Sequence, residues 1–191
     1  MAYNPQIKAD SEIFEKIRFI SVDERYILKP IMPEIIENEA MFYKINSGDE
    51  RMKKYLPAYY ADDSETSEKH LHDLIQRSLF RQSILYCIRD KNQPFPIGYL
   101  NIISPLSPTG LNDWSVDFWM GKIAEGKGHM SASLNKLLDY MATMKIETVK
   151  ALVDKDNIRS INVLEKVGFQ MLNIEKGGLR LLMSVNIKDR I

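Results

Sequence analysis

In "KIAEGKGHMSASL", residues 122–134, two glycines and a lysine lie at the start of an apolar segment with helical periodicity. Glycine adopts backbone conformations that other residues avoid, so successive N–H groups around Gly126, Lys127 and Gly128 could point at one anion. The helix that follows adds its positive end. The pattern predicts a phosphate or diphosphate cradle, and a tight turn that only packs helix on strand is the competing interpretation.

Two better-known phosphate motifs do not match this loop. A P-loop needs Ser or Thr after its Gly-Lys, whereas Gly128 follows Lys127 here, and the spacing of a Rossmann G-x-G-x-x-G is absent. Their absence disfavours a nucleotide-phosphate binder of either type.

A second stretch, "NIRSINVLEKVGF", begins at Asn157. Asn157 is a good helix N-cap, and Ser160 lies one turn further along on the same side. Gly168 ends this helix just before Phe169 starts a strand. Each of these features also has a purely structural use.

Alternating strand-like and helix-like segments surround both motifs and predict a mixed α/β fold. Pro33 stands where a helix could begin and Gly48 where it would end, and the aromatic segment 49–63 reads as a loop. The expected strands are 25–31, 83–90, 96–104, 114–120, 146–153, 169–174 and 179–187, and the expected helices are 33–47, 65–80, 128–144 and 156–168.

The composition and charge of the chain exclude several classes of function. A chain of 191 residues suits a single domain, and 26 basic residues against 26 acidic ones create no global field toward nucleic acid or an anionic membrane. The single cysteine, Cys87, rules out an internal disulfide, and the polar start is not a signal peptide. No apolar run approaches the ~20 residues that span a bilayer. We therefore expect a soluble, cytoplasmic protein.

The histidines do not indicate a metal site. His70 and His72 are two residues apart on an expected helix and so face different directions, and His129 is remote in sequence. We expect surface or capping roles for them and no bound metal. Trp114, Phe118 and Trp119 are expected in the core.

Together, the strand "VDFWM", the loop "EGKGHMSASL" and the set Asn157-x-x-Ser160 with Glu165 to Phe169 resemble the GNAT superfamily of acetyltransferases. More narrowly, they are similar to its RimJ/RimL-like branch of ribosomal-protein alanine N-acetyltransferases. The resemblance implies one acetyltransferase domain over residues 1–191, with an N-terminal extension over 1–23 and an acetyl-CoA-binding core over 116–169. It also implies the acetyltransferase (GNAT) fold, an α/β (α+β) architecture whose mixed, mostly antiparallel central sheet has six to seven strands flanked by helices.

The resemblance also assigns roles to residues. Acetyl-CoA is the implied acetyl donor. The end of the strand at Met120 would splay from the next strand at a bulge and admit the pantetheine arm, which Asn157 would bind and whose thioester Ser160 would face. The diphosphate would lie on the backbone of the loop and the first helical turn, with a hydroxyl from Ser131. These backbone residues are Gly126, Lys127, Gly128, His129 and Met130.

Three positions depart from the family pattern. Glu125 stands where the family usually has Arg or Gln, and a carboxylate beside a diphosphate is unfavourable unless it points away. Met130 replaces a small residue, and Leu164 stands where many members have a tyrosine general acid. Ser160 is then the remaining hydroxyl for protonating the leaving thiolate, although water could suffice because a thiolate is a fair leaving group.

The catalytic base is inferred from position. Strict alternation in "WSVDFWM" puts Asp117 on the same strand face as Ser115 and Trp119. Asp is depleted in strands, so Asp117 needs a reason to be there. Near the expected opening at Met120, it could reach an amine through a water. An ion pair or backbone hydrogen bonds are the competing explanation.

The sequence thus predicts transfer of an acetyl group from acetyl-CoA to a primary amine, either a protein N-terminus or a small molecule. We expect no nucleic-acid or membrane partner, and a homodimer is compatible with this assignment. The alternative is a non-catalytic CoA-binding or protein-interaction module on the same fold.

Overall fold

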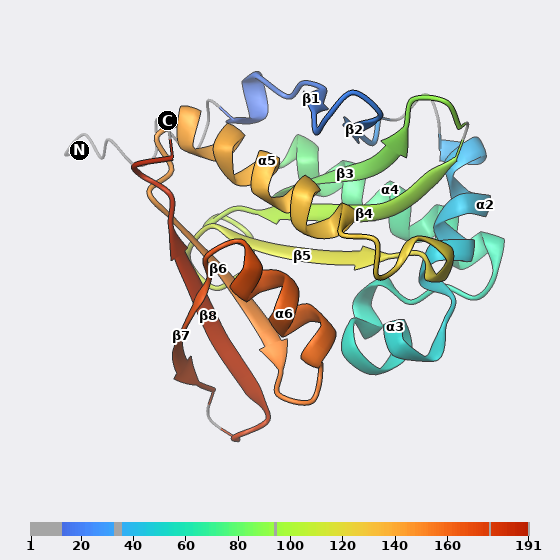
Figure 1. Cartoon of the computed structure of the whole chain (residues 1–191). Helices are drawn as coiled ribbons and strands as arrows, with labels where there is room; N and C mark the ends of the chain where they lie inside the picture. The colour runs from blue at the N-terminus through green and yellow to red at the C-terminus, as the bar shows by residue number, and fades with distance from the viewer. Residues whose placement is uncertain (1–12, 33–35, 94, 176, 191) are drawn as a thin grey trace.

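A computed structural model describes residues 13–32, 36–93, 95–175 and 177–190. These residues form one twisted sheet with helices on both of its faces (Figure 1). The strand order is β1-β2-β3-β4-β5-β6-β8-β7, and β5 and β6 are the parallel neighbours in it. The strands are β1 (Ile20–Ser21), β2 (Tyr26–Pro30), β3 (Ser83–Asp90), β4 (Pro96–Ile103), β5 (Ser115–Met120), β6 (Thr148–Asp154), β7 (Gln170–Ile174) and β8 (Arg180–Asn186).

The predicted mixed, mostly antiparallel sheet is confirmed, and the described residues give it eight strands rather than six to seven. The additional strand is β1, which pairs antiparallel with β2 and belongs to the segment expected to be an N-terminal extension. Parts of that segment pack onto the domain. Ile13 is fully buried in the core, and the backbone carbonyl of Lys16 accepts a hydrogen bond of 2.7 Å from the Tyr140 hydroxyl.

The helices agree with the sequence pattern except in one region. They are α2 (Ile36–Ser47), α3 (Glu50–Tyr55), α4 (Ser64–Leu79), α5 (His129–Thr143) and α6 (Ile158–Lys166), with the 3-10 turns η2 (Pro57–Tyr59) and η3 (Lys122–Ala124). Gly48 follows α2, as expected, whereas Pro33 lies outside the described residues. The loop predicted over 49–63 is wrong in part, because Asp49 caps α3 by accepting from the backbone N–H groups of Arg51 and Met52.

Two hydrophobic cores lie on opposite faces of the sheet. On one face α5 and α6 cover a large core that contains Val116 and Leu134. On the other face α2 and α4 cover a smaller core that contains Leu71, Tyr99 and Trp119. The alternation predicted for β5 is therefore confirmed, since Val116 and Trp119 enter different cores.

The sheet opens between its two parallel strands. Ser115 and Lys150 are the registered pair between β5 and β6 in the described chain, and beyond it the strands separate (Figure 1). The bulge expected near Met120 is wrong, because β4 and β5 stay in regular register from Ser115 to Met120. A register shift lies instead between β3 and β4, at Ile88 and Arg89. Divergence of the two strands, without a bulge in β5, creates the opening.

Candidate active site

A cavity of about 380 Å³ lies where β5 and β6 separate. Its walls include β5 from Ser115 to Phe118 and β6 from Ala151 to Asp154. The region of α3 and η2 contributes Tyr55 and Tyr59, and the start of α6 contributes Asn157 and Ser160. The cavity thus brings together the predicted base, the two predicted α6 residues and the aromatic segment between the first helices.

Asp117 receives a hydrogen bond from a buried tyrosine. The Tyr59 hydroxyl donates to Asp117 Oδ2 over 2.6 Å, and Asn101 Nδ2 donates to the Tyr59 oxygen over 2.9 Å. Asn101 lies directly opposite Asp117 in the register of β4 and β5. The ring of Tyr59, only 7% exposed, lies 4.8 Å from that of Trp119. Packing and two hydrogen bonds therefore fix the tyrosine that contacts the carboxylate.

Burial perturbs both acidic groups of this pair. Desolvation raises the pKa of the Asp117 carboxyl above its ordinary value, and the hydrogen bond from Tyr59 acts in the opposite direction. Burial, followed by the nearby Asp117 charge, raises the pKa of Tyr59 well above that of a free tyrosine. Tyr59 therefore stays protonated as a donor, while Asp117 has the raised proton affinity that suits a general base.

The start of α6 presents two polar side chains to the cavity. Asn157 is the N-cap, and its Oδ1 accepts from the backbone N–H of Ser160 over 3.3 Å. Both residues line the cavity together with Leu164, which is buried in the same helix. The capping role predicted for Asn157 is confirmed, and it places Ser160 at the cavity wall.

The glycine loop has the open geometry of an anion cradle. Gly126 and Gly128 have φ angles of 72° and 80°, the left-handed region that favours glycine. A Cβ placed on either glycine would meet nothing within 4 Å, so both backbones are open to an approaching group. The first turn of α5 adds N–H groups that have no acceptor within the helix. The residues present therefore fit a bound diphosphate.

The predicted loop residues differ in what their side chains contact. Met130 and Ser131 are 6% and 8% exposed, so the Met130 side chain belongs to the core and only its backbone suits the predicted role. Lys127 Nζ donates to the carbonyl of Ile123 over 3.0 Å. His129 packs against the ring of Tyr26 with centroids 4.4 Å apart, and burial lowers its pKa. Met120 packs against the large core.

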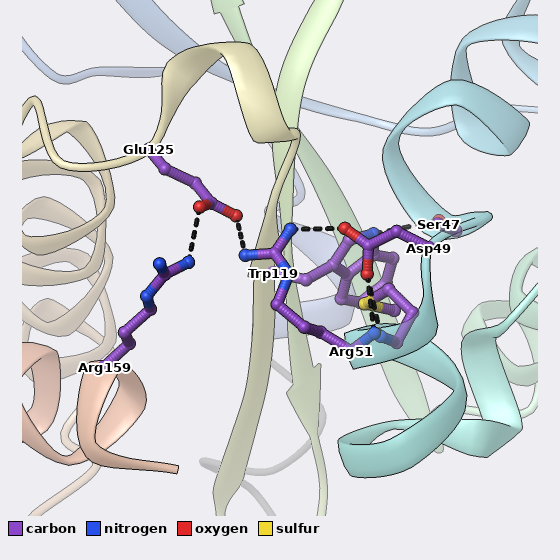
Figure 2. A network of polar contacts seen from close by, with 7 residues as sticks. Ser47, Asp49, Arg51, Trp119, Glu125 and Arg159 are labelled. Atoms are coloured by element: carbon purple, nitrogen blue, oxygen red, sulfur yellow. Dashed lines mark hydrogen bonds and ion pairs between the residues drawn. The ribbon is translucent and has the colours of Figure 1, made fainter.

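Glu125 is held between two arginines (Figure 2). Its Oε2 accepts from Arg159 of α6 over 2.7 Å, and its Oε1 accepts from Arg51 of α3. The Arg51 guanidinium also pairs with Asp49. The carboxylate that departs from the family pattern is therefore neutralised by side chains from two other elements.

Comparison with known proteins decides the family. Residues 25–170 match the family model described as an acetyltransferase (GNAT) domain. The chain belongs to the GNAT acetyltransferase family. No curated protein matches it at a significant level.

Solved structures of other acetyltransferases have the same fold. A RimL ribosomal-protein alpha-N-acetyltransferase in complex with coenzyme A superposes with a TM-score of 0.74 at 20% identity, covering 90% of this chain and 99% of that one. A ribosomal-protein-alanine acetyltransferase from Vibrio fischeri gives 0.72 at 18% identity, covering 91% and 98%. RimJ from Mycobacterium smegmatis, in complex with a CoA disulfide, gives 0.63 at 17% identity, covering 84% and 81%.

Sequence reasoning missed two residues of this GNAT site. Asn101 and His70 were given no role beside the cavity. His70 lines the cavity, and its buried Nδ1 has no hydrogen-bond partner within the described chain. Burial lowers the pKa of His70. A polar residue in the middle of an apolar strand, as with Asn101 in "PIGYLNII", is the one local signal that could have found the pair with Asp117.

Among the described residues, no three His, Cys, Asp or Glu side chains lie close enough to hold a metal ion. Within the same part of the chain, no helix is both long and apolar enough to cross a bilayer.

Proposed function

We propose that this GNAT protein transfers an acetyl group from acetyl-CoA to a primary amine, with Asp117 as the general base. One observation carries the proposal: a carboxylate of raised pKa, fixed by Tyr59, lines the same cavity as Asn157 and Ser160 at the opening between β5 and β6. A base must lie within reach of the proton that it removes, and a cavity-wall carboxylate meets that need.

Asp117 and Ser160 would each move a proton in the reaction. When bound, acetyl-CoA supplies a thioester-activated acetyl group. Asp117 takes a proton from the incoming ammonium, which leaves a neutral amine nitrogen as the nucleophile. Ser160 is the cavity hydroxyl proposed to donate its proton to the leaving thiolate and to regain one from the nitrogen, which loses its second proton as the amide forms. Positioning within the cavity supplies much of the remaining rate.

The donor would be held by backbone groups more than by side chains. Gly126, Lys127, Gly128, His129 and Met130 would offer main-chain N–H groups to the diphosphate, and Ser131 would add a hydroxyl at the first turn of α5. Asn157 would bind the pantetheine arm beside the free edge of β5. The fit rests on the open space at both glycines, which other residues would fill.

The acceptor is proposed as a protein N-terminus or a small-molecule amine. Two of the similar structures are named as ribosomal-protein acetyltransferases, which supports the first. The cavity wall carries Asp73, Asp117 and Asp154 against Arg77 and Arg180, and an excess of carboxylates would favour a protonated amine of either kind.

Release of CoA thiol from acetyl-CoA tests the proposal. The purified chain would be mixed with acetyl-CoA and either alanine- and serine-initiated peptides or small amines, and the same peptides with blocked N-termini would serve as the matched control. We expect thiol release with at least one free amine and none with its blocked form. Calorimetric binding of CoA without turnover on any amine would leave the non-catalytic module in its place.

A further inference from the structure

One carboxylate joins three separate elements beside the glycine loop. Glu125 immediately precedes Gly126, Arg159 is the second residue of α6, and Arg51 is the second residue of α3. Figure 2 shows the Glu125 side chain between the two guanidinium groups, with each carboxylate oxygen accepting from a different arginine. The ion pair between Glu125 and Arg159 thus connects the loop after β5 to the helix after β6, across the side where the two strands separate.

The two arginines compensate the carboxylate beside the loop. Glu125 and Asp49 carry two negative charges, and Arg51 and Arg159, which remain charged at any physiological pH, carry two positive ones. An anion that settles on the open backbone of Gly126 and Gly128 therefore meets a carboxylate whose charge is compensated.

The two arginines are held with different firmness. Arg51 is 38% exposed and has two carboxylate partners. The Arg159 side chain is 74% exposed and pairs with Glu125. An exposed ion pair of this kind contributes little free energy, so Arg159 can leave Glu125 at small cost. Phosphate oxygens accept the parallel N–H groups of a guanidinium at least as well as a carboxylate does.

We propose that Arg159 is a phosphate-binding side chain of the cofactor site, which exchanges Glu125 for the diphosphate when acetyl-CoA binds. Glu125 positions Arg159 beside the loop before binding and is retained by Arg51 afterwards. This inference rests on the proposed function, because it assumes that the glycine loop receives the diphosphate. Arg159 of α6 would then supply the positive charge that the loop lacks, because position 125 is a glutamate in this chain.

Calorimetric dissociation constants for three variants test the exchange. Arg159→Gln removes the cation, Glu125→Gln removes the competing carboxylate, and Lys166→Gln removes an exposed cation from the other end of the same helix as a matched control. We expect Arg159→Gln to raise the Kd for CoA about tenfold, the value of one charge-assisted hydrogen bond. Glu125→Gln should leave the Kd equal or lower, and Lys166→Gln should leave it unchanged.

The ligand series identifies which phosphate is bound. Dephospho-CoA keeps the diphosphate and lacks the 3′-phosphate, so equal weakening of CoA and dephospho-CoA by Arg159→Gln supports the proposal. Weakening of CoA alone would assign Arg159 to the 3′-phosphate and overturn it. Equal weakening by Glu125→Gln and Arg159→Gln would show that the ion pair only braces the fold. A wild-type chain that binds no CoA overturns both proposals, whereas an Arg159→Gln variant that binds CoA normally overturns this one alone.

Discussion

Replacement of Tyr59 by phenylalanine removes one hydrogen bond and keeps the ring that packs on Trp119. In the wild-type chain this hydroxyl donates to Asp117 Oδ2 over 2.6 Å. The hydrogen bond lowers the pKa of Asp117, whereas burial raises it. A hydrogen bond to a charged group is worth about 1.5–3 kcal/mol. One pH unit corresponds to about 1.4 kcal/mol, so the pKa of Asp117 should rise by about one unit or more in Tyr59→Phe.

The sign of the pH effect follows from the role of the base. Asp117 accepts a proton only when it is ionised, so activity is lost as the pH falls through its pKa. The acidic limb of the kcat/KM profile should therefore move to higher pH by about one unit in Tyr59→Phe, with activity at high pH close to that of the wild type. The assay is thiol release from acetyl-CoA, measured across the pH range with a saturating donor.

Two control variants test whether the acidic limb of the pH profile reports the ionisation of Asp117. Tyr60→Phe removes the neighbouring hydroxyl, which donates to Asp62 over 2.8 Å on the surface, and should leave the profile unchanged. His70→Gln removes the titratable imidazole on the same cavity wall. The other charged groups on this wall are Asp73, Arg77, Asp154 and Arg180. A limb that stays in place in Tyr59→Phe, or that disappears in His70→Gln, would refute the assignment to Asp117.

Three further outcomes are expected. Asp117→Asn should lower turnover about 10²-fold at neutral pH and leave the Kd for CoA unchanged. Because folding raises the pKa of Asp117, its contribution to stability is lost as the pH rises, so the melting temperature of Asp117→Asn should exceed that of the wild type at high pH and not at low pH. Acetyl-CoA at a hundredfold excess over its Kd should stabilise the wild-type fold by about 2.7 kcal/mol, and Gly128→Val should abolish that shift while the chain still melts cooperatively, since the new side chain fills the open cradle at a positive φ. Leu111→Ala, on the cavity wall away from the glycine loop, should change the ratio of kcat/KM between amines more than it changes the Kd for CoA, and a loss of CoA affinity with unaltered amine preference would contradict this expectation.

Local patterns in the sequence determined the elements that carry the site. Helical spacing of apolar residues predicted α5, because a helix that covers a sheet must present one apolar stripe to it. The capping side chain of Asn157 predicted the start of α6, and the two glycines predicted the positive φ angles of the loop. Each feature depends on residues that lie within a few positions of one another. Asp117 was also found locally, as a carboxylate in an otherwise apolar strand.

Tertiary structure alone decided the partners of these residues. Tyr59 and Asp117 are 58 positions apart, and Arg159 and Glu125 are 34 positions apart. Contacts at such separations depend on the order of strands in the sheet and on which helix covers which face. Neither is encoded by periodicity or by capping. The same reason explains why Glu125 looked unfavourable beside a diphosphate, since the two arginines that neutralise it come from α3 and α6.

The opening in the sheet was likewise a tertiary outcome. The family resemblance implied a bulge at Met120, yet β5 keeps its regular pairing with β4 throughout, and the cavity forms because β6 pairs with β5 at Ser115 and then diverges. Backbone pairing is satisfied on the β4 side, so the free edge of β5 faces the cavity without a bulge. A strand sequence specifies which side chains face each core, but only the packing of the neighbouring elements decides where two strands separate.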